Sequence, residues 1–364
     1  MAPVENKHWQ TPLFRWQPES PNPKDRPHDG GPDMTATATS DKRATRIAEE
    51  DPWSITTPVP IPRKEMRGLQ KRSNGPAAGW LVGHLVLLAG SSTLIWWALP
   101  SWWVILPMFL QGGLIVFLFA PMHECSHGTA FRARKFNTAV AMFCGFLNMR
   151  PALYFRYRHA AHHSYTQDPE RDPDQVPFPE TVRGYFGEVF GMAFWPKMVG
   201  TLYRGFLGRY NDQEETFIPA NERGRVSAEV RVFVAIYAVI AAGSIVTGTW
   251  VFPLLYWVLP RFVAEPLLRT FRIAEHTGME EGPNLLSNTR TTLTNPLVRF
   301  VYWNMPYHAE HHLAPSVPFH NLPKMHRTMP AGTLDPANGY LRVHRDLVRR
   351  IREGDTKFDP GSRA

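Results

Sequence analysis

Cysteine is scarce in this sequence: only Cys125 and Cys144 occur among its 364 residues. An iron–sulfur cluster takes about four protein ligands, so two thiols cannot hold one. A pair of cysteines that faces the cytoplasm is expected to stay reduced. The two cysteines therefore provide neither a cluster site nor an expected disulfide.

Charged residues are missing from two long apolar runs. Gly79–Leu99 and Trp102–Met122 contain no Lys, Arg, Asp or Glu, and each is about 20 residues long, enough to cross a bilayer core of roughly 30 Å. Two further candidate spans follow. Val230–Gly248 contains one charged residue, Arg231, and Val251–Ile273 is interrupted by prolines and charged residues. Buried helices of soluble proteins are the alternative, but they are usually shorter than this. The runs predict an all-α integral membrane protein with four transmembrane helices in two hairpins.

A signal peptide is also missing, because the first residues have no apolar core region. Residues 1–63 are rich in Pro, Asp, Arg, Thr and Ser, which predicts a disordered cytoplasmic tail. Residues 64–330 form the predicted membrane domain, and residues 331–364 a cytoplasmic C-terminal helix and tail. The net charge of +8 is explained first by basic residues beside the spans, so we expect no nucleic-acid partner.

The basic residues predict how the chain is oriented in the membrane. A basic run, Arg63–Arg72, comes directly before the first span, whereas the turns near Pro100 and near residues 248–251 contain no Lys or Arg. Positively charged loops stay on the cytoplasmic side. We therefore expect both termini on the cytoplasmic side, together with the segments that follow the second and fourth spans.

Those two segments contain three histidine motifs. HECSH spans His123 to His127, HAAHH spans His159 to His163, and HAEHH spans His308 to His312. On a helix, residues at i, i+3 and i+4 share a face, so each motif can direct two or three imidazoles to one point. With 15 histidines in the chain, one H-x-x-H-H pattern would arise by chance roughly 0.03 times. The motifs predict a metal site in a helical cytoplasmic cap.

His276 lies just after the fourth span, on the predicted side of the motifs, and is a ninth candidate ligand. Nine imidazoles are too many for one zinc ion, which takes about four ligands. They suit two metal ions that are borderline between hard and soft, the kind that imidazole binds well. Acidic residues beside the motifs can accept the second ring N–H of a ligand histidine. The candidates are Glu124, Glu275, Glu310, Asp168, Glu170, Asp172 and Asp174; the sequence does not decide among them. The remaining histidines His84, His320, His326 and His344 are interpreted as packing or surface residues.

Together, HECSH, HAAHH and HAEHH resemble the motifs of the membrane fatty acid desaturase and hydroxylase superfamily of di-iron enzymes. The stretches NTRTT (Asn288–Thr292) and WNMPYHAEHHLAPSVPFHNLP (Trp303–Pro323) are similar to a bacterial-type branch. That branch includes rhizobitoxine-pathway desaturases and fatty acid decarboxylases that form 1-alkenes. The resemblance implies two iron ions held by His123, His127, His159, His162, His163, His276, His308, His311 and His312.

The resemblance also implies an activity. Two irons, with O2 as co-substrate and two electrons, can oxidise an unactivated C–H bond of a fatty acyl or lipid-like chain, and desaturation is the favoured outcome. The resemblance further implies a water-mediated metal contact from Asn304, and we count Asn304, Glu310 and Asp172 as candidate catalytic residues. The acyl substrate could be free or linked to CoA, a carrier protein or a lipid. No fused redox domain is apparent, so a separate donor such as ferredoxin, or cytochrome b5 with its reductase, is expected.

Other functions stay open at this point. Hydroxylation, or oxidative decarboxylation of a free fatty acid to a 1-alkene, could occur at the same irons, because the outcome depends on positions of the substrate carbon that differ on the order of 1 Å. A zinc-dependent membrane hydrolase would need fewer histidines and a carboxylate base. A metal transporter would place its ligands at mid-membrane depth.

Overall fold

The structure, a computed structural model, describes Trp53 and residues 57–355. Helices make up nearly all the regular structure of these residues, and the strands are the two-residue β1 (Thr292–Leu293) and β2 (Ala337–Asn338), which pair in parallel. The all-α prediction is therefore confirmed. The predicted N-terminal tail lies almost entirely outside the described residues, as do residues 356–364 of the predicted C-terminal tail.

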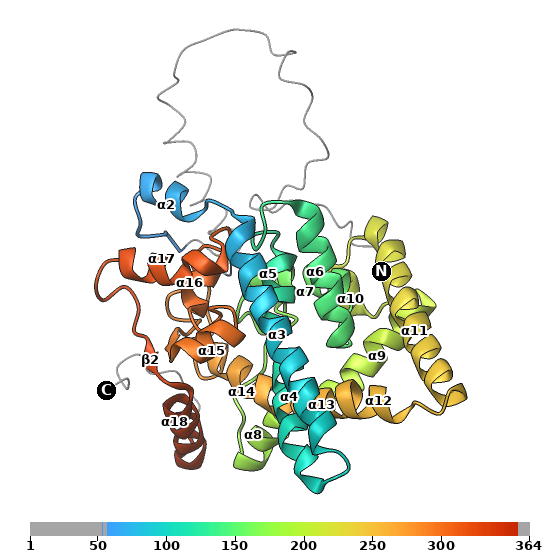
Figure 1. The fold of residues 1–364 in the computed structure, drawn as a ribbon. Helices are drawn as coiled ribbons and strands as arrows, with labels where there is room; N and C mark the ends of the chain where they lie inside the picture. Colours follow the sequence, from blue (N-terminus) through green and yellow to red (C-terminus); the bar gives the residue numbers. More distant parts are fainter. Residues whose placement is uncertain (1–52, 54–56, 356–364) are drawn as a thin grey trace. The chain divides into compact units, whose positions relative to one another are not determined.

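Four helical stretches of the described residues are long and apolar enough to cross a membrane, as predicted (Figure 1). They cover Asn74–Ala98, Trp102–Ser126, Ala220–Val246 and Val251–His276. The first and third begin upstream of the apolar runs because polar residues continue the same helices. The elements that form these stretches are α3 (Asn74–Ala98), η1 (Trp102–Val104), α4 (Ile105–Phe117), α5 (Phe119–Ser126), η2 (Ala220–Glu222), α11 (Arg223–Val246), α12 (Val251–Pro253), the π-helix η3 (Leu254–Val258), α13 (Leu259–Val263) and α14 (Glu265–His276).

The fourth stretch is broken into pieces where its prolines occur. Pro253, Pro260 and Pro266 remove backbone donors and interrupt regular helix geometry. Two of its buried charged residues pair with each other, since Arg261 Nη1 lies 2.7 Å from Glu265 Oε2. Charged side chains inside membrane segments are tolerated when they are paired and face the protein interior.

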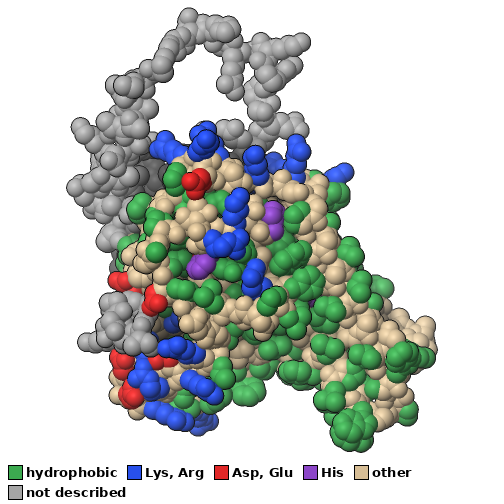
Figure 2. Space-filling model, turned by 60° about the vertical axis from the view of Figure 1, so that its left-hand side comes forward, with side chains coloured by type: hydrophobic (Ala, Val, Ile, Leu, Met, Phe, Trp, Pro, Cys, Tyr) green, Lys and Arg blue, Asp and Glu red, His purple; other side chains and the backbone are tan. Residues whose placement is uncertain are grey.

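Polar side chains also join the membrane helices to one another. Gln111 of α4 donates to the carbonyl oxygen of Tyr256 in η3 at 3.0 Å and to Ser92 of α3 at 3.2 Å. Nε2 of His84 in α3 lies 2.8 Å from the carbonyl oxygen of Leu114 in α4. Backbones approach closely where α4 crosses α13, because Gly112 leaves room for the carbonyl of Pro260. Large apolar side chains of these helices face outward, and Figure 2 shows wide hydrophobic areas on one such face.

The remaining helices form the cap that positions the histidine motifs. In Figure 1, α5 and α7 lie near the centre with α16 beside them. Glu229 of α11 accepts from the backbone N–H groups of Ala152 (2.9 Å) and Leu153 (2.8 Å), so it caps the N-terminus of α7. The cap elements are α2 (Arg63–Leu69), α6 (Arg134–Leu147), α7 (Ala152–Tyr165), α8 (Val182–Val189), α9 (Phe194–Leu207), α10 (Asp212–Phe217), α15 (Pro296–Val301), α16 (His308–Leu313), η4 (Phe319–Asn321), α17 (Leu322–Thr328) and α18 (Tyr340–Glu353).

An aromatic cluster packs the C-terminal part of the cap against the first membrane helix. The ring of Trp80 in α3 lies 5.3 Å from Phe300 of α15 and 5.1 Å from Phe319 of η4. Trp303 and Phe319 are fully buried, and the centres of their rings lie 4.5 Å apart. This packing holds the segment that leads into α16 next to the membrane helices.

Candidate metal centre

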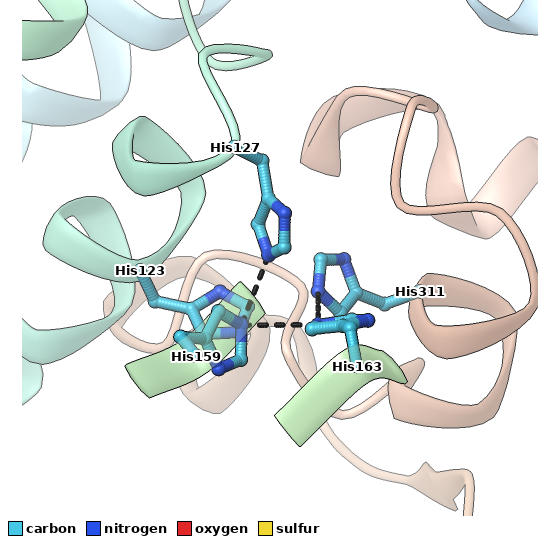
Figure 3. A group of neighbouring side chains, drawn as sticks. All are labelled: His123, His127, His159, His163 and His311. Atoms are coloured by element: carbon cyan, nitrogen blue, oxygen red, sulfur yellow. Dashed lines mark hydrogen bonds between the residues drawn. The ribbon is translucent and has the colours of Figure 1, made fainter. Parts of the chain in front are cut away.

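The structure brings the nine candidate histidines together in two groups. Within each group, one nitrogen per residue lies within 4.8 Å of the others. The first group contains five side chains, His123, His127, His159, His163 and His311, and is drawn in Figure 3. The second group contains four, His162, His276, His308 and His312.

Each H-x-x-H-H motif contributes to both groups. In α7, His159 and His163 are four residues apart and belong to the first group, whereas His162 between them belongs to the second. In α16 the arrangement is reversed, because His308 and His312 belong to the second group and His311 to the first. On a helix, the side chains at i and i+4 point in nearly the same direction. The side chain at i+3 is rotated by about 100° from the one at i+4 and points to a neighbouring position. One helical turn therefore serves two neighbouring sites.

The nitrogens converge as ligands of a common ion would. Nε2 of His159 lies 2.9 Å from Nε2 of His127 and 3.0 Å from Nε2 of His163, which is 3.2 Å from Nε2 of His311 (Figure 3). In the second group, Nε2 of His276 and His308 lie 3.1 Å apart. Imidazole nitrogens bound about 2.0–2.1 Å from one metal ion are separated by about this much. The two groups thus fit one borderline metal ion each.

Six ring nitrogens in the groups are buried without a hydrogen-bond partner among the described residues. Two of them are Nε2 of His123 and Nε2 of His312, and both side chains are buried. A buried polar atom without a partner costs roughly 1–3 kcal/mol. Coordination to a metal ion would satisfy both atoms.

Burial keeps most of these imidazoles neutral. It lowers the pKa of His127 to about 3, and the charge of Arg156 acts in the same direction. Burial and the neighbouring imidazoles hold the pKa values of His159, His163, His308, His311 and His312 well below the ordinary value. A neutral imidazole keeps the lone pair that a metal ion requires.

Acceptors next to the histidines orient the rings. Nδ1 of His162 lies 2.9 Å from Asp172 Oδ1, and this pairing raises the pKa of His162 although burial acts against it. Nδ1 of His276 lies 3.2 Å from the carbonyl oxygen of Asn288. An Nδ1–H that donates to such an acceptor leaves Nε2 free for the metal. The structure therefore places Asp172 as an orienting residue of the second group.

Glu124 lies between two ligands of the first group. Its Oε1 is 3.3 Å from Nδ1 of His123 and 3.5 Å from Nδ1 of His311, and the side chain is fully buried. In the second group, Glu275 Oε2 is 3.6 Å from Nε2 of His308, and its Oε1 accepts from the hydroxyl of Tyr302 at 2.7 Å. A carboxylate in the position of Glu124 can fix ring orientation and increase ligand basicity. Glu275 instead faces Nε2 of His308, the nitrogen that also faces His276.

Two candidate catalytic residues are not brought into either group. Glu310 accepts from the hydroxyl of Thr291 and contacts Nδ1 of His326. The amide of Asn304 donates to the carbonyl oxygen of Phe319 at 3.1 Å and accepts from Arg299 Nε at 3.2 Å. The Glu310 carboxylate and the Asn304 amide are thus held by partners outside the nine histidines.

Sequence reasoning missed three residues that support the second group. Thr166 Oγ1 lies 3.2 Å from Nδ1 of His312, and Gln167 donates to the carbonyl oxygen of His276 at 2.7 Å. Tyr302 holds Glu275 as described above. Thr166 and Gln167 directly follow α7, which was an available signal, whereas nothing in the sequence pairs Tyr302 with Glu275.

A cavity of about 220 Å³ borders both groups. His123 and His159 line it from the first group, and His162, His276 and His308 from the second. Its other walls include the aromatic rings of Phe119 and Phe155, together with several arginines. A molecule in this cavity would touch ligands of both candidate metal ions.

Comparisons with known proteins give one family and several relatives. A family model described as fatty acid desaturase matches residues 94–344, more than half of the chain. Dihydrorhizobitoxine desaturase from Bradyrhizobium elkanii is 26% identical over 260 residues, which cover 67% of this chain and 71% of that protein. The sn-1 oleoyl-lipid 12-desaturase from Synechocystis sp. is 25% identical, with coverages of 68% and 72%. The sphingolipid delta(4)-desaturase from Drosophila melanogaster is 26% identical, with coverages of 74% and 85%.

Proposed function

Since this chain belongs to the fatty acid desaturase family, a family of membrane oxidoreductases that oxidise fatty acyl chains, we propose that each of its two histidine groups holds one iron ion. When bound, the two irons supply the O2-dependent oxidising power needed to remove hydrogen from an unactivated C–H bond. The metal ligands in this proposal are the five and the four histidines described above. Desaturation of an acyl chain is the proposed reaction.

The observation that carries the proposal is the division of each H-x-x-H-H motif between two adjacent groups. A single zinc site uses about four ligands, and a catalytic one about three with an open position. Five and four buried imidazoles around two centres exceed that need. They suit two ions of borderline character with room for a small molecule.

The protein's own residues position the ligands and the substrate. Glu124, Asp172 and the Asn288 carbonyl orient histidine rings from outside the two groups. Phe119 and Phe155 form an apolar wall beside the histidines in the shared cavity. Burial of the ligands excludes water and would protect the substrate from side reactions.

The substrate in this proposal is a fatty acyl chain. Two of the similar proteins are named for lipids, an sn-1 oleoyl-lipid and a sphingolipid, and a third for dihydrorhizobitoxine. We place the acyl chain in the cavity that borders both histidine groups. Electrons come from a separate donor in this proposal, ferredoxin or cytochrome b5 with its reductase.

We also propose that both termini and the metal centre face the cytoplasm. The basic residues of α2 and the absence of Lys and Arg from the turns after α3 and α11 support this orientation. Residues 64–330 would then be the catalytic membrane domain.

Product analysis tests the proposed function. Purified enzyme loaded with iron is given O2, a reducing system and isotope-labelled acyl substrates, free and lipid-linked, and the products are identified by mass spectrometry. We expect an alkene of unchanged chain length, and no product from a His159→Ala variant. A hydroxylated chain or a 1-alkene shortened by one carbon would instead assign one of the two related reactions, and hydrolysis without oxidation would contradict the proposal.

A further inference from the structure

Arginines line the cavity next to the two histidine groups. Arg150 precedes α7, Arg158 lies on α7, and Arg269 and Arg272 lie on α14. These four guanidinium groups line a cavity of about 220 Å³. An apolar acyl chain alone would not require positive charge there. The neighbouring charges decide how much of it is neutralised.

Arg150 and Arg272 both lie against the aromatic ring of Phe119. Their guanidinium carbons are 5.4 Å and 5.1 Å from the centre of the Phe119 ring. That ring is in turn 6.0 Å from the ring of His123. One aromatic ring therefore separates both guanidinium groups from a candidate metal ligand.

The nearby carboxylates do not neutralise all of these cations. Glu265 is shared, because Oε1 lies 3.2 Å from Arg150 and Oε2 lies 2.7 Å from Arg261. Asp174 is shared as well, at 2.7 Å from Arg158 and 3.7 Å from Arg272. The longer of these distances exceeds hydrogen-bonding range. Each of these two carboxylates thus serves two guanidinium groups. Glu188 pairs with Arg269 at 2.5 Å, and the charge of Glu275 acts on Arg272. Five arginines and Lys197 therefore share four carboxylates, and some positive charge remains uncompensated.

Arg150 shows the consequence of this shortage. Its Nε is buried and has no hydrogen-bond partner among the described residues. Burial lowers the pKa of Arg150 to about 9, and the charges of Arg261 and Arg272 act in the same direction while Glu265 opposes them. A buried guanidinium group that lacks full charge compensation and has an unused N–H donor is stabilised when an anion binds beside it.

We propose that Arg150 and Arg272 bind the carboxylate of a free carboxylic acid, with the attached carbon chain extending along Phe119 toward the histidine groups. Guanidinium groups match the planar carboxylate with paired hydrogen bonds. This inference rests on the proposed function, because it names the class of acyl substrate used there.

Binding to the metal-free protein tests the proposal without depending on catalysis. The protein in lipid nanodiscs is titrated with octanoate, methyl octanoate and octan-1-ol, and affinities are measured by calorimetry. We expect octanoate to bind at least about tenfold more tightly than the two uncharged probes, as charge-assisted hydrogen bonds would provide. Equal affinity for all three would overturn the proposal.

Variants of Arg272 identify the group that binds the anion. Arg272→Gln should remove the preference for octanoate without changing the affinity for octan-1-ol, and Arg272→Lys should restore part of it. Arg183→Gln, at an exposed position on α8, is the matched control and should keep the preference. Arg150→Lys is used in place of a neutral variant because loss of charge there would weaken the pairing of buried Glu265. If folded Arg272→Gln keeps the full preference for octanoate, the assignment is wrong.

The test separates this inference from the proposed function. If the enzyme oxidises lipid-linked chains but does not bind octanoate preferentially, the carboxylate site is overturned. The proposed oxidation activity is then still supported. Preferential binding of octanoate that depends on Arg272, without any oxidised product, would support the site and contradict the proposed function.

Discussion

At the scale of single residues, the spacing within a histidine motif determines which candidate ion each side chain serves. His308 and His312, four residues apart, join His276 in the second group, and His311 joins the first. His276 comes from a different segment and completes the second group with His162. Replacing it should affect one site more than the other.

We predict that His276→Ala reduces the iron content from about two to about one ion per chain and abolishes activity. The second group would keep three imidazoles, fewer than the four it presents in the structure. The measurement is elemental analysis of the purified variant beside the wild type. His84→Ala, which alters a histidine outside both groups, is the control and should retain the wild-type iron content. Unchanged iron in His276→Ala would remove this residue from the ligand set.

Glu124 and Glu310 offer a matched comparison of two buried carboxylates. Glu124 contacts Nδ1 of His123 and His311, so Glu124→Ala should weaken iron affinity by about 10–100-fold. Glu310 contacts Thr291 and His326 instead, so Glu310→Gln should lower the free energy of unfolding by about 1–3 kcal/mol and leave iron affinity unchanged. Competition with a chelator and thermal unfolding measure the two effects. Equal iron affinities in the two variants would refute the distinction.

The clustering of the nine histidines could be predicted at this scale, and their surroundings could not. The motif spacing identified eight histidines, and the place of His276 after the fourth span identified the ninth. The roles considered for Asn304 and Glu310 came from proximity in sequence or from family resemblance. Rotation about a helix points Glu310 away from its neighbours His311 and His312, and tertiary contacts hold Asn304 against Phe319. Such contacts are not encoded in local spacing.

At the scale of helices, the crossing of α4 and α13 depends on Gly112. A Cβ added there would overlap the carbonyl oxygen of Pro260 and lie 2.8 Å from the Cβ of Ala264. Gly112→Ala should therefore destabilise the protein by about 1–3 kcal/mol, the usual cost of overpacking. The midpoint of thermal unfolding in detergent measures this. Gly90→Ala is the control, because a Cβ at Gly90 meets nothing within 4 Å; equal midpoints for both variants would contradict the predicted clash.

The buried Glu214 of α10 makes part of the stability depend on pH. Burial raises the pKa of Glu214, but hydrogen bonds from Arg204 and from the backbone of Asn211 outweigh it, so the pKa lies below its ordinary value. A carboxyl whose pKa is lowered by folding contributes stability above its unfolded pKa of about 4.3. That contribution is lost as the pH falls through the folded value.

We therefore predict that Glu214→Gln lowers the unfolding midpoint at pH 7 and that its difference from the wild type shrinks below about pH 4. The neighbouring Glu215 pairs with Arg223 at 3.1 Å and is about half exposed, so Glu215→Gln should change the midpoint little at either pH. Thermal unfolding across this pH range makes the comparison. A Glu214→Gln difference that is constant with pH would refute the role of its charge.

Helix positions were predictable where composition decides them. The absence of charge in residues 79–99 and 102–122 indicated two spans, and the structure has long helices there. Helix ends were less predictable, because α3 begins at Asn74 and the third stretch at Ala220, in polar sequence that continues the helix. The breaks in the fourth stretch follow from its prolines, but the pairing of Arg261 with Glu265 required the tertiary structure.

At the scale of the whole molecule, membrane helices and cap cooperate to form one centre. α5 continues the second stretch and carries His123, α14 ends the fourth and carries His276, and Glu229 of the third caps α7. α7 and α16 then supply six of the nine imidazoles. The membrane helices thus help to position the histidines as well as anchoring the protein.

The metal content of the purified protein distinguishes a di-iron enzyme from a zinc enzyme. We predict about two iron ions per chain and little zinc, measured by elemental mass spectrometry on protein produced with both metals available. About one zinc ion per chain and no iron would contradict the di-iron proposal and return the zinc-dependent hydrolase to first place.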